Sequence, residues 1–412
     1  MLKDINLEMK VSIIGQGYVG LTIAEGAASA GYEVVGYDID RLLIANLAQG
    51  QTHVPGINSD NLKDLISRNL YTPTSSTEQL NDSNIYILAV PTPLDHNRLP
   101  DLRALGSAAE LVSKIVKKGS LVINESTSHP GTLRNFIKPL IDPDGELEVL
   151  FAVAPERVDP GNSIWGLKNT PRVVSGLDGE AIDRALEFYS KICDSIYSAP
   201  STEIAEASKL FENTFRQVNI ALVNEFSLIA SKIGFSAHEA IRAASTKPFG
   251  FMPFYPSIGV GGHCIPIDPV YLTEASKNAG EKTPLIDTAT EINLIMNSKV
   301  VKRIQEYLKK DLRGLKIQIA GISYKTDVSD MRESPAVSLM QQLEKFGALV
   351  SWHDPVVKSF QNKLSEPINP AIDLGLIVTP HKKIDFSTWK NYGTTVLDLS
   401  ANSDNFGWPK FL

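Results

Sequence analysis

The sequence predicts an α/β protein with two Rossmann-like doubly wound domains joined by a long central helical segment. Short apolar segments alternate with amphipathic, helix-like stretches from the start of the chain. The pattern then becomes continuously helical, and strand-like segments return near the C-terminal end. Apolar strands separated by helices are typical of a parallel sheet that is covered on both faces. We therefore expect an N-terminal domain at 1–200, a central segment at 201–305 and a C-terminal domain at 306–412.

The expected strands of the first domain are short and apolar, and each ends in Gly, Pro or a small polar residue. They are "KVSIIG" at 10–15, "EVVGYD" at 33–38, "NIYILAV" at 84–90, "SLVINES" at 120–126 and "LFAVAP" at 150–155. Helical periodicity follows from about 201 to 245 and again near 285–310. In the last domain we expect strands at 315–322, 348–354, 374–378 and 394–400.

Composition narrows the class of protein. The formal net charge of −7 argues against a nucleic-acid partner, because phosphate contacts require a basic face. The chain has 2 cysteines, too few for a disulfide framework, which favours a reducing, cytoplasmic compartment. Residues 1–10 do not resemble a secretory signal, and we expect no membrane-spanning segment.

A glycine motif predicts the first site. Gly15-x-Gly17-x-x-Gly20 follows the first strand and begins a helix, which is the arrangement that holds a dinucleotide pyrophosphate. Asp38 ends the next strand, where a carboxylate accepts the ribose hydroxyls and repels a 2′-phosphate, so we expect NAD rather than NADP. The alternative is a glycine-rich turn beside a strand-capping aspartate. The expected cofactor contacts here are Gly15, Gln16, Gly17, Tyr18, Val19, Gly20, Asp38 and Arg41.

The stretch "GVGGHCIPIDP" at 259–269 predicts a reactive thiol. Cys193 lies in the apolar stretch "EFYSKICDSIY" and is expected to be a buried structural cysteine, whereas Cys264 lies in a loop just before an expected helix, where the thiolate is favoured. We therefore interpret Cys264 as a nucleophile. His263 is expected to make a loop hydrogen bond rather than to bind a metal, and no metal site is expected. Asp268 is either the cap of that helix or a catalytic group.

Lys209 and Asn213 are four residues apart on the expected central helix and so share a face. An ammonium and an amide placed together can stabilise a developing oxyanion. The alternative is an exposed Lys209 that pairs with Glu206 one turn away.

With these residues the chain resembles the nucleotide-sugar 6-dehydrogenases, the family of the UDP-glucose and GDP-mannose dehydrogenases. The motifs that carry the resemblance, besides the glycine motif, are "AVPTP" at 89–93, "ESTSHPGT" at 125–132, "APERVDPGN" at 154–162, "KLFENTFRQVNIALVNE" at 209–225, the cysteine loop, and "GISYKTDVSDMRESPA" at 321–336. The stretch "STKPFGFMPFYP" at 245–256 is most similar to the UDP-N-acetylglucosamine 6-dehydrogenases of bacterial surface-polysaccharide pathways.

The resemblance implies roles for individual residues. Cys264 is implied as the nucleophile, with Lys209, Asn213 and Asp268 assisting hydride transfer and hydrolysis, and Glu156 orienting or activating water. Thr92, Thr127 and Arg332 are implied at the NAD cofactor. The implied contacts of the UDP-sugar are Glu156, Arg157, Lys209, Asn213, Tyr255, Gly259 and Lys325. The family also implies a dimer or higher homo-oligomer that packs through the central helix.

Two departures from the glucose enzymes put glucose in doubt. Those enzymes carry a lysine where this chain has Ile267, and an arginine in the region that here reads "TKPFGF". A third, smaller departure is Ser257, where the acetamido-sugar branch usually has glycine. Lys247 is our candidate for a buried group that binds the acetamido oxygen, and we expect at least half of Phe249, Phe251, Phe254 and Tyr255 to fill the core.

These observations leave three hypotheses. The first is four-electron oxidation of the C6 hydroxyl of UDP-N-acetylglucosamine, with UDP-N-acetylmannosamine or UDP-glucose as alternative substrates. The second is a two-electron NAD-dependent dehydrogenase of the 3-hydroxyacid type, which has no need of Cys264. The third is a nucleotide-sugar binder without catalysis.

Overall fold

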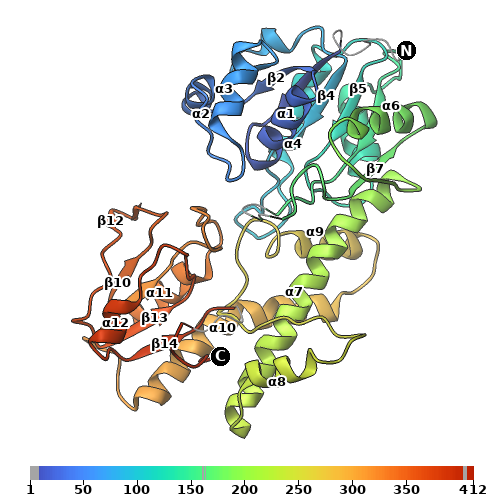
Figure 1. The fold of residues 1–412 in the computed structure, drawn as a ribbon. Helices are drawn as coiled ribbons and strands as arrows, with labels where there is room; N and C mark the ends of the chain where they lie inside the picture. Colours follow the sequence, from blue (N-terminus) through green and yellow to red (C-terminus); the bar gives the residue numbers. More distant parts are fainter. Residues whose placement is uncertain (1–8, 160–161, 163, 402–405) are drawn as a thin grey trace. The chain divides into compact units, whose positions relative to one another are not determined.

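The computed structural model of the chain describes residues 9–159, 162, 164–401 and 406–412 (Figure 1). The expectation that the N-terminus carries no secretory signal therefore falls almost wholly outside the described residues. The chain packs as two compact units. The first holds the described residues up to Glu212 together with Val270–Asn278, and the second holds Asn213–Pro269 and Ala279–Leu412. The three-part division of the sequence stays a prediction.

An eight-stranded sheet forms the centre of the first unit, in the order β3-β2-β1-β4-β5-β6-β7-β8. The strands are parallel except where β7 runs antiparallel to β6. Their bounds are β1 Lys10–Ile14, β2 Glu33–Tyr37, β3 Tyr71–Thr74, β4 Ile85–Leu88, β5 Leu121–Asn124, β6 Leu150–Val153, β7 Arg172–Gly176 and β8 Ile196–Ser198. The run from β3 to β6 has the strand order of a dinucleotide-binding fold.

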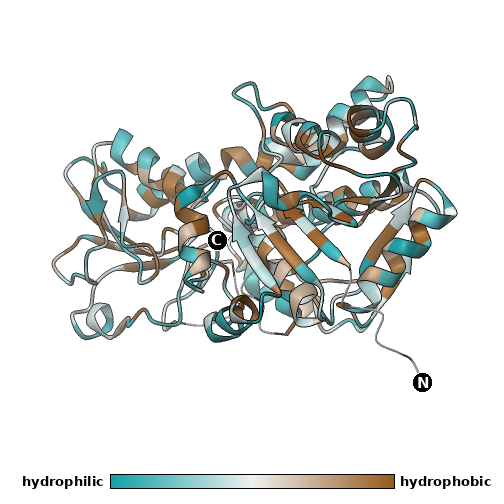
Figure 2. Cartoon of the chain, turned by 90° about the horizontal axis from the view of Figure 1, so that it is seen from above, coloured by the Kyte–Doolittle hydropathy of each residue, from teal (hydrophilic) through white to brown (hydrophobic). Residues whose placement is uncertain are grey.

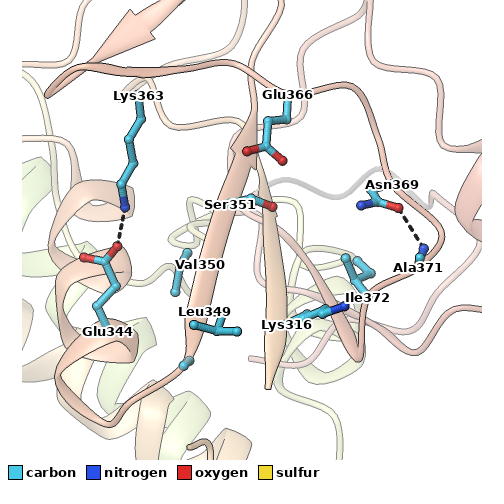
Figure 3. Close-up of a pocket in the computed structure, with 11 residues that line it drawn as sticks. Lys316, Glu344, Leu349, Val350, Ser351, Lys363, Glu366, Asn369, Ala371 and Ile372 are labelled. Carbon is cyan, nitrogen blue, oxygen red and sulfur yellow. Dashed lines mark hydrogen bonds and ion pairs between the residues drawn. The ribbon is translucent and has the colours of Figure 1, made fainter. Parts of the chain in front are cut away.

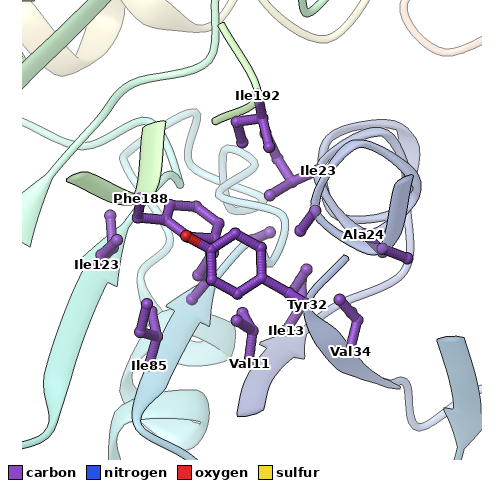
Figure 4. Close-up of a cluster of buried hydrophobic side chains, with 14 of the residues drawn as sticks. Val11, Ile13, Ile23, Ala24, Tyr32, Val34, Ile85, Ile123, Phe188 and Ile192 are labelled. Carbon is purple, nitrogen blue, oxygen red and sulfur yellow. The ribbon is translucent and has the colours of Figure 1, made fainter. Parts of the chain in front are cut away.

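Both faces of this sheet are buried, because successive side chains of a strand point to opposite faces. Ile85 and Ile87 of β4 join one hydrophobic cluster, and Tyr86 and Leu88 join the other. Figure 4 shows the first cluster, in which the rings of Tyr32 and Phe188 lie 5.3 Å apart between their centroids. In Figure 2 brown, hydrophobic stretches mark strands of the sheets, whereas the loops carry both teal and brown stretches.

Helices connect these strands, as the alternating pattern predicts. In the first unit they are α1 Tyr18–Ser29, α2 Arg41–Ala48, α3 Ser59–Ser67, α4 Arg103–Ser113, α5 Lys138–Ile141 and α6 Gly179–Ser190, with short turns η2 Thr77–Leu80 and η3 Leu133–Ile137. Three of them begin at a capping side chain. Asp40, Asn58 and Asp178 accept backbone N–H bonds at the starts of α2, α3 and α6.

The central segment is helical, as expected. Its helices are α7 Thr202–Ile233, α8 Ala237–Ala244, α9 Asp268–Asn278 and α10 Pro284–Leu308. At 32 residues α7 is about 48 Å long, since an α-helix rises 1.5 Å per residue. Both α7 and α9 contribute residues to each unit, because the unit boundaries fall within them.

A second parallel sheet, in the order β10-β9-β13-β14, lies in the second unit. Its strands are β9 Lys316–Ala320, β10 Leu349–His353, β13 Leu374–Ile377 and β14 Val396–Asp398, and the hairpin strands β11 Ser359–Phe360 and β12 Lys363–Leu364 stand apart from it. Helices α11 Pro335–Lys345 and α12 Ser387–Asn391 complete this part of the unit. The fold is therefore the predicted one, with two Rossmann-like α/β parts and a helical segment between them in the chain.

Within the described residues we find no helix that combines the length and the apolar character required to cross a bilayer.

Candidate active site

Five of the predicted site positions in the first unit follow parallel strands of the large sheet. The glycine motif follows β1, Asp38 follows β2, Thr92 follows β4, Thr127 follows β5 and Glu156 follows β6. Because the carboxyl ends of parallel strands lie along one edge, all five positions belong to the same edge of the sheet. Ligands of open α/β sheets bind at this edge, where the strand order reverses between β1 and β4.

The glycine motif fits a dinucleotide pyrophosphate. A Cβ on Gly15, whose φ is +96°, would lie 2.4 Å from the carbonyl oxygen of Ala89, and a Cβ on Gly20 would lie 1.8 Å from that of Gly15. A Cβ on Gly17 would instead meet no atom within 4 Å. The first and third glycines therefore pack the turn, and the second leaves open space at the start of α1, where a phosphate is favoured.

Asp38 is fixed in place beside this turn. Its carboxylate accepts the backbone N–H of Gln16 at 2.8 Å and that of Asp40 at 2.9 Å. A carboxylate held this way at the end of β2 has its remaining lone pairs available for hydroxyl donors. This is the position that a ribose-binding aspartate takes in dinucleotide sites.

The remaining residues predicted at the cofactor differ in exposure. The Gln16 side chain is buried and bonds to the carbonyls of Ile13 and Gly15 and to the hydroxyl of Tyr71, so it supports the turn. Tyr18 and Val19 are half-buried, and Arg41, the first residue of α2, is exposed.

Glu156 lies in a cluster of buried charge. One carboxylate oxygen accepts an N–H of Arg172 at 2.5 Å, and the other accepts the backbone N–H groups of Arg157 and Val158 at 2.6 and 2.5 Å. Arg172 also pairs with the buried Glu125. Burial raises the pKa of Glu156, and the backbone bond from Val158 and the positive charge of Lys209 oppose that rise.

The expected alternative for Lys209, an exposed pair with Glu206, is wrong. Lys209 is half-buried, and the fully enclosed carboxylate of Glu206 instead accepts the backbone N–H groups of Gly131 and Leu133 at 2.6 and 2.9 Å. The charge of Lys209 acts on Glu156 within the same unit.

Arg157 is engaged with protein groups. It pairs with Glu212 at 2.8 Å and donates to the carbonyl of Pro171 at 2.7 Å. Its predicted contact with the sugar nucleotide stays a prediction.

Thr92 belongs to a loop that α9 supports. The fully buried Tyr271 of α9 donates its hydroxyl to the carbonyls of Thr92 and Pro93, at 3.2 and 3.4 Å. The short segment Val270–Asn278 thus completes the first unit although it is distant in the sequence.

In the second unit, Asp268 is more than a helix cap. Helix α9 begins at Asp268, as predicted to within a residue, and the buried carboxylate accepts the side-chain amide of Asn213 at 2.5 Å. The backbone N–H of Asp268 donates to the carbonyl of Cys264 at 2.8 Å. Two predicted site residues, Asn213 and Asp268, are thus joined directly, and Cys264 lies one turn before Asp268. Cys264 is partly exposed, whereas Cys193 is buried, as expected.

The cysteine loop begins at a polar anchor. The side chain of Asn224 accepts the backbone N–H of Ser257 at 2.8 Å, and the Ser257 hydroxyl donates to the carbonyl of Gly259 at 2.8 Å. Gly259 has a φ of +130°, which strongly favours glycine. Ser257, the smaller departure noted above, therefore adds a bond within the loop.

The aromatic stretch before this loop was expected to place at least half of its four rings in the core, but none of them is fully buried. Phe249 and Phe251 are 71% and 41% exposed, and Phe254 and Tyr255 are half-buried. Phe254 contacts the ring of Phe215, and Tyr255 stacks on His238 with 5.4 Å between ring centroids. Lys247 is also exposed and lies over the Phe249 ring, so the expectation that it is a buried binding group is wrong for the single chain.

Lys325 and Arg332 lie on the loop that follows β9, again at the carboxyl edge of a parallel sheet. Gly321 begins this loop with a φ of +83°, and a Cβ there would lie 1.9 Å from the carbonyl oxygen of Thr379. Lys325 is half-buried, and Arg332 forms a bidentate pair with Asp330, with its closest N···O distance at 2.5 Å.

A separate pocket of about 490 Å³ contains none of the predicted site residues (Figure 3). Its lining includes Lys316 and Leu349, the first residues of β9 and β10, so it opens at the amino end of these strands. The pair between Lys363 and Glu344 closes one side at 2.8 Å. We assign no role in the reaction to this pocket.

Several residues of these clusters were not predicted from the sequence. Arg172, Glu125, Glu206, Tyr271 and Asp330 all bond to or approach predicted site residues or their loops. Glu125 and Asp330 do lie within the motifs "ESTSHPGT" and "GISYKTDVSDMRESPA", which is the one signal that pointed to them.

Comparison with known proteins agrees with this geometry. Three domains of the UDP-glucose/GDP-mannose dehydrogenase family match in order: the NAD binding domain at residues 9–193, the central domain at 203–294 and the UDP binding domain at 318–402. A UDP-N-acetyl-D-mannosamine dehydrogenase of Pyrococcus horikoshii is 35% identical over 395 residues, which is 94% of this chain and 93% of the relative.

A UDP-N-acetyl-D-glucosamine 6-dehydrogenase of Pseudomonas aeruginosa is 33% identical over 360 residues, or 85% of this chain and 84% of the relative. Among solved structures, a UDP-D-ManNAc dehydrogenase from Pyrococcus horikoshii superposes with a TM-score of 0.85 at 32% identity, covering 97% of this chain and 98% of the other. The motifs, the two Rossmann-like parts and these matches together make the chain a member of the UDP-glucose/GDP-mannose dehydrogenase family, an NAD-dependent UDP-sugar dehydrogenase.

Proposed function

We propose that the protein oxidises the C6 hydroxyl of a UDP-N-acetylhexosamine, UDP-N-acetylglucosamine in the first place, to the uronic acid through a covalent intermediate on Cys264. The observation that carries this proposal is the bond between Asn213 and Asp268, which joins an amide and a carboxylate. Asp268 lies one turn after Cys264, whose thiol is partly exposed, whereas Cys193 is buried.

When bound, NAD accepts a hydride from carbon. Gly15, Gly17, Gly20 and Asp38 would hold its pyrophosphate and ribose, because the open space at Gly17 and the fixed carboxylate of Asp38 fit those groups. Thr92, Thr127 and Arg332 would line the cofactor. Two hydrides must leave C6, so two NAD are consumed per sugar.

Cys264 explains how the second hydride becomes available. The first oxidation leaves a planar aldehyde with no C–H bond suited to a second transfer. Addition of the thiolate forms a C–S bond and moves the carbonyl electrons to oxygen, which restores a tetrahedral carbon that carries a hydrogen. Loss of that hydrogen as hydride gives a thioester. Water then adds to the thioester, the C–S bond breaks, and the thiolate and the carboxylate product are released.

Other predicted site residues would stabilise the charges and accept the protons of these reaction steps. Lys209 and Asn213 would stabilise the oxyanion, as preorganised donors do in acyl transfer. Asp268 would orient Asn213, and Glu156, whose pKa is raised by burial, would accept a proton from the hydrolytic water. Arg157, Tyr255, Gly259 and Lys325 would contact the sugar nucleotide.

The family does not favour a two-electron 3-hydroxyacid dehydrogenase or a binder without catalysis. The sugar epimer is the open question, because relatives of similar identity are named for the mannosamine and the glucosamine substrates. Ile267 and the absence of arginine from "TKPFGF" support an acetamido sugar over glucose.

The decisive experiment counts NADH formed per UDP-sugar consumed. We expect two NADH for each sugar with the wild-type protein, and accumulation at the aldehyde stage with Cys264→Ser, which has no thiolate to add to the aldehyde. One NADH per sugar, or full turnover by the serine variant, contradicts the covalent mechanism.

Substrate choice is tested by parallel initial rates with the three UDP-sugars. A site that hydrogen-bonds the acetamido group leaves a buried polar group unpaired when glucose binds, which costs about 1–3 kcal/mol. We therefore expect kcat/KM for UDP-N-acetylglucosamine to be at least about tenfold above that for UDP-glucose. Equal use of UDP-glucose contradicts the assignment, and a clear preference for UDP-N-acetylmannosamine assigns the manno epimer instead.

A further inference from the structure

The two glycines before His263 let the cysteine loop pack against a distant segment. A Cβ on Gly261 would lie 2.6 Å from the ring of Pro335 and 3.0 Å from the carbonyl oxygen of Glu333, and a Cβ on Gly262 would lie 2.8 Å from the ring of Tyr324. The backbone N–H of Gly262 donates to the carbonyl of Arg332 at 3.2 Å. The residue after these glycines is therefore held beside the loop at 324–334 and the start of α11.

This packing brings His263 to Asp330. The imidazole Nδ1 lies 3.6 Å from a carboxylate oxygen of Asp330, although 67 residues separate them in the sequence. The Asp330 side chain is only 9% exposed, and its backbone carbonyl accepts the N–H of Tyr324 at 3.0 Å. Asp330 is thus held in a fixed position within its loop.

The thiol is the imidazole's neighbour in the chain. Cys264 follows His263 directly, and after Asp330 it is the next group that acts on the ring. The titratable groups that act on the ring include Asp330, Cys264 and Arg332. Arg332 opposes a positive charge on His263, but it is itself paired with Asp330.

We propose that His263 is a catalytic partner of Cys264: Asp330 holds the imidazole in its protonated form, and the imidazolium stabilises the thiolate that attacks the aldehyde.

The nearby carboxylate of Asp330, and after it Cys264, raise the pKa of His263 to about 9 against the effect of burial, so the ring is charged at neutral pH. Although burial raises the pKa of Asp330, His263 and Arg332 hold it well below its usual range, so the acid is ionised. With Arg332 and a thiolate at Cys264, the four groups carry two charges of each sign. Neighbouring cations of this kind increase the thiolate fraction of a cysteine.

The sequence adds a reason for this arrangement. Ile267 stands where the glucose enzymes have a lysine, and its side chain is apolar and buried. The loop of this chain therefore has no cation at 267, and His263 supplies one next to the sulfur.

The inference rests on Cys264 being the nucleophile, and its test needs neither cofactor nor substrate. Cys264 of the full-length protein is alkylated with iodoacetamide from pH 5.5 to 10, and the modified peptide is quantified by mass spectrometry. With His263→Gln we expect the alkylation rate at pH 7 to fall about tenfold, because the thiolate loses its neighbouring cation. His263→Lys, which restores a cation, should recover most of the loss.

Two controls accompany this comparison. Cys193 is buried, and burial raises the pKa of its thiol to about 11, so its labelling at pH 7 reports unfolding rather than chemistry. His353→Gln replaces a half-buried histidine of the same unit, whose ring nitrogen lies 2.8 Å from the carbonyl oxygen of Glu366, and should leave the Cys264 profile unchanged.

A profile of His263→Gln that superposes on that of the wild type overturns the proposal. So does a lysine variant no more reactive than the glutamine variant, because the role would then be a hydrogen bond and not a charge.

The pairing with Asp330 has its own readout. Titration of the His263 ring by NMR should show a midpoint near pH 9 in the wild type that falls by at least one unit in Asp330→Asn. A midpoint near 6.5 in the wild type overturns the proposal. These outcomes are distinct from failure of the proposed function, which the NADH count with Cys264→Ser detects whatever the alkylation profile.

Discussion

At the scale of single residues, Arg172 shows how the first unit keeps charge in its interior. The guanidinium is 2% exposed and contacts two buried carboxylates, Glu125 and Glu156. Glu125 also accepts the hydroxyl of Tyr189, and Arg172 donates to the carbonyl of Ala154 at 2.9 Å. Such a network is held together by the cation, because without it two acids would share a low-dielectric site.

Removal of this cation should therefore be costly. We expect Arg172→Met to lower the free energy of unfolding by about 3–5 kcal/mol at pH 7, which denaturant titration measures. Arg103→Gln is the matched control, because Arg103 pairs with Asp101 but is 86% exposed, and we expect a change within about 0.5 kcal/mol. A loss below about 1 kcal/mol for Arg172→Met would show that the two carboxylates do not depend on it.

At the scale of elements, the first turns of α7 stabilise the loop that follows β5. Glu206 reaches from α7 to the backbone N–H groups of Gly131 and Leu133, at the start of η3. Burial raises its pKa to about 7, and these two bonds only partly oppose that effect. Helix α7 thus supports the loop that carries Thr127, but the support requires the burial of the Glu206 carboxyl group.

The burial of Glu206 makes the free energy of unfolding depend on pH. The folded chain holds a proton on Glu206 up to about pH 7 while the unfolded chain loses it near 4.5, so stability falls as pH rises through that window. We therefore compare the free energy of unfolding of Glu206→Gln with that of the wild type. The difference, variant minus wild type, should increase by at most about 3 kcal/mol from pH 5 to pH 8.

Glu203→Gln is the control for this prediction. Its pKa is lowered to about 2, chiefly by the hydrogen bond from Arg134, so Glu203 is ionised in both states above pH 5. The difference between this variant and the wild type should stay constant from pH 5 to pH 8. An equally flat difference for Glu206→Gln would contradict the assigned protonation.

At the scale of the whole molecule, an apolar stripe runs along α7. Its members lie seven or four residues apart, which keeps them on one side of a helix, and each is at least 43% exposed in the single chain: Ile204, Phe211, Phe215, Leu222, Ile229 and Ile233. A helix face of this kind is rarely left in water, and a twofold dimer is the commonest closed assembly. We therefore predict a homodimer that packs through α7.

Sedimentation velocity tests this assembly. We expect a dimer at micromolar concentration, and dissociation to monomers when Leu222 and Ile229 are both changed to Glu, because two buried charges would face the partner. Tyr392→Glu is the control, since Tyr392 is 73% exposed and lies on the C-terminal part of the second unit. A monomeric wild-type protein would contradict the prediction.

Much of the fold could be predicted because local signals agree with it. Apolar runs followed by turn residues marked β1, β2, β4, β5 and β6, and the glycine motif placed the cofactor edge. Strand β3, strand β7, which reverses direction beside β6, and the short β8 were not predicted, because their pairing depends on contacts across the sheet.

The site was predicted less completely, for the same reason. Cys264, Asn213 and Asp268 stand in recognisable motifs, and two of them do bond. The partners of Glu206 lie 73 or more residues away in the sequence, and Asp330 lies 67 residues from His263. From sequence spacing alone, Glu206 was paired with Lys209 instead. The exposure of Phe249 and Phe251 shows that an aromatic run alone does not predict burial.

The contribution of α9 to the first unit has a consequence for synthesis on the ribosome. The buried Tyr271 donates its hydroxyl to the loop of Thr92. The chain must therefore be synthesised to about residue 278 before the first unit has all of its residues. At 5–20 residues per second, the 66 residues from 212 to 278 take roughly 3–13 s to translate. During that interval the nascent first unit lacks Val270–Asn278, and with it the Tyr271 hydroxyl that bonds to the loop of Thr92.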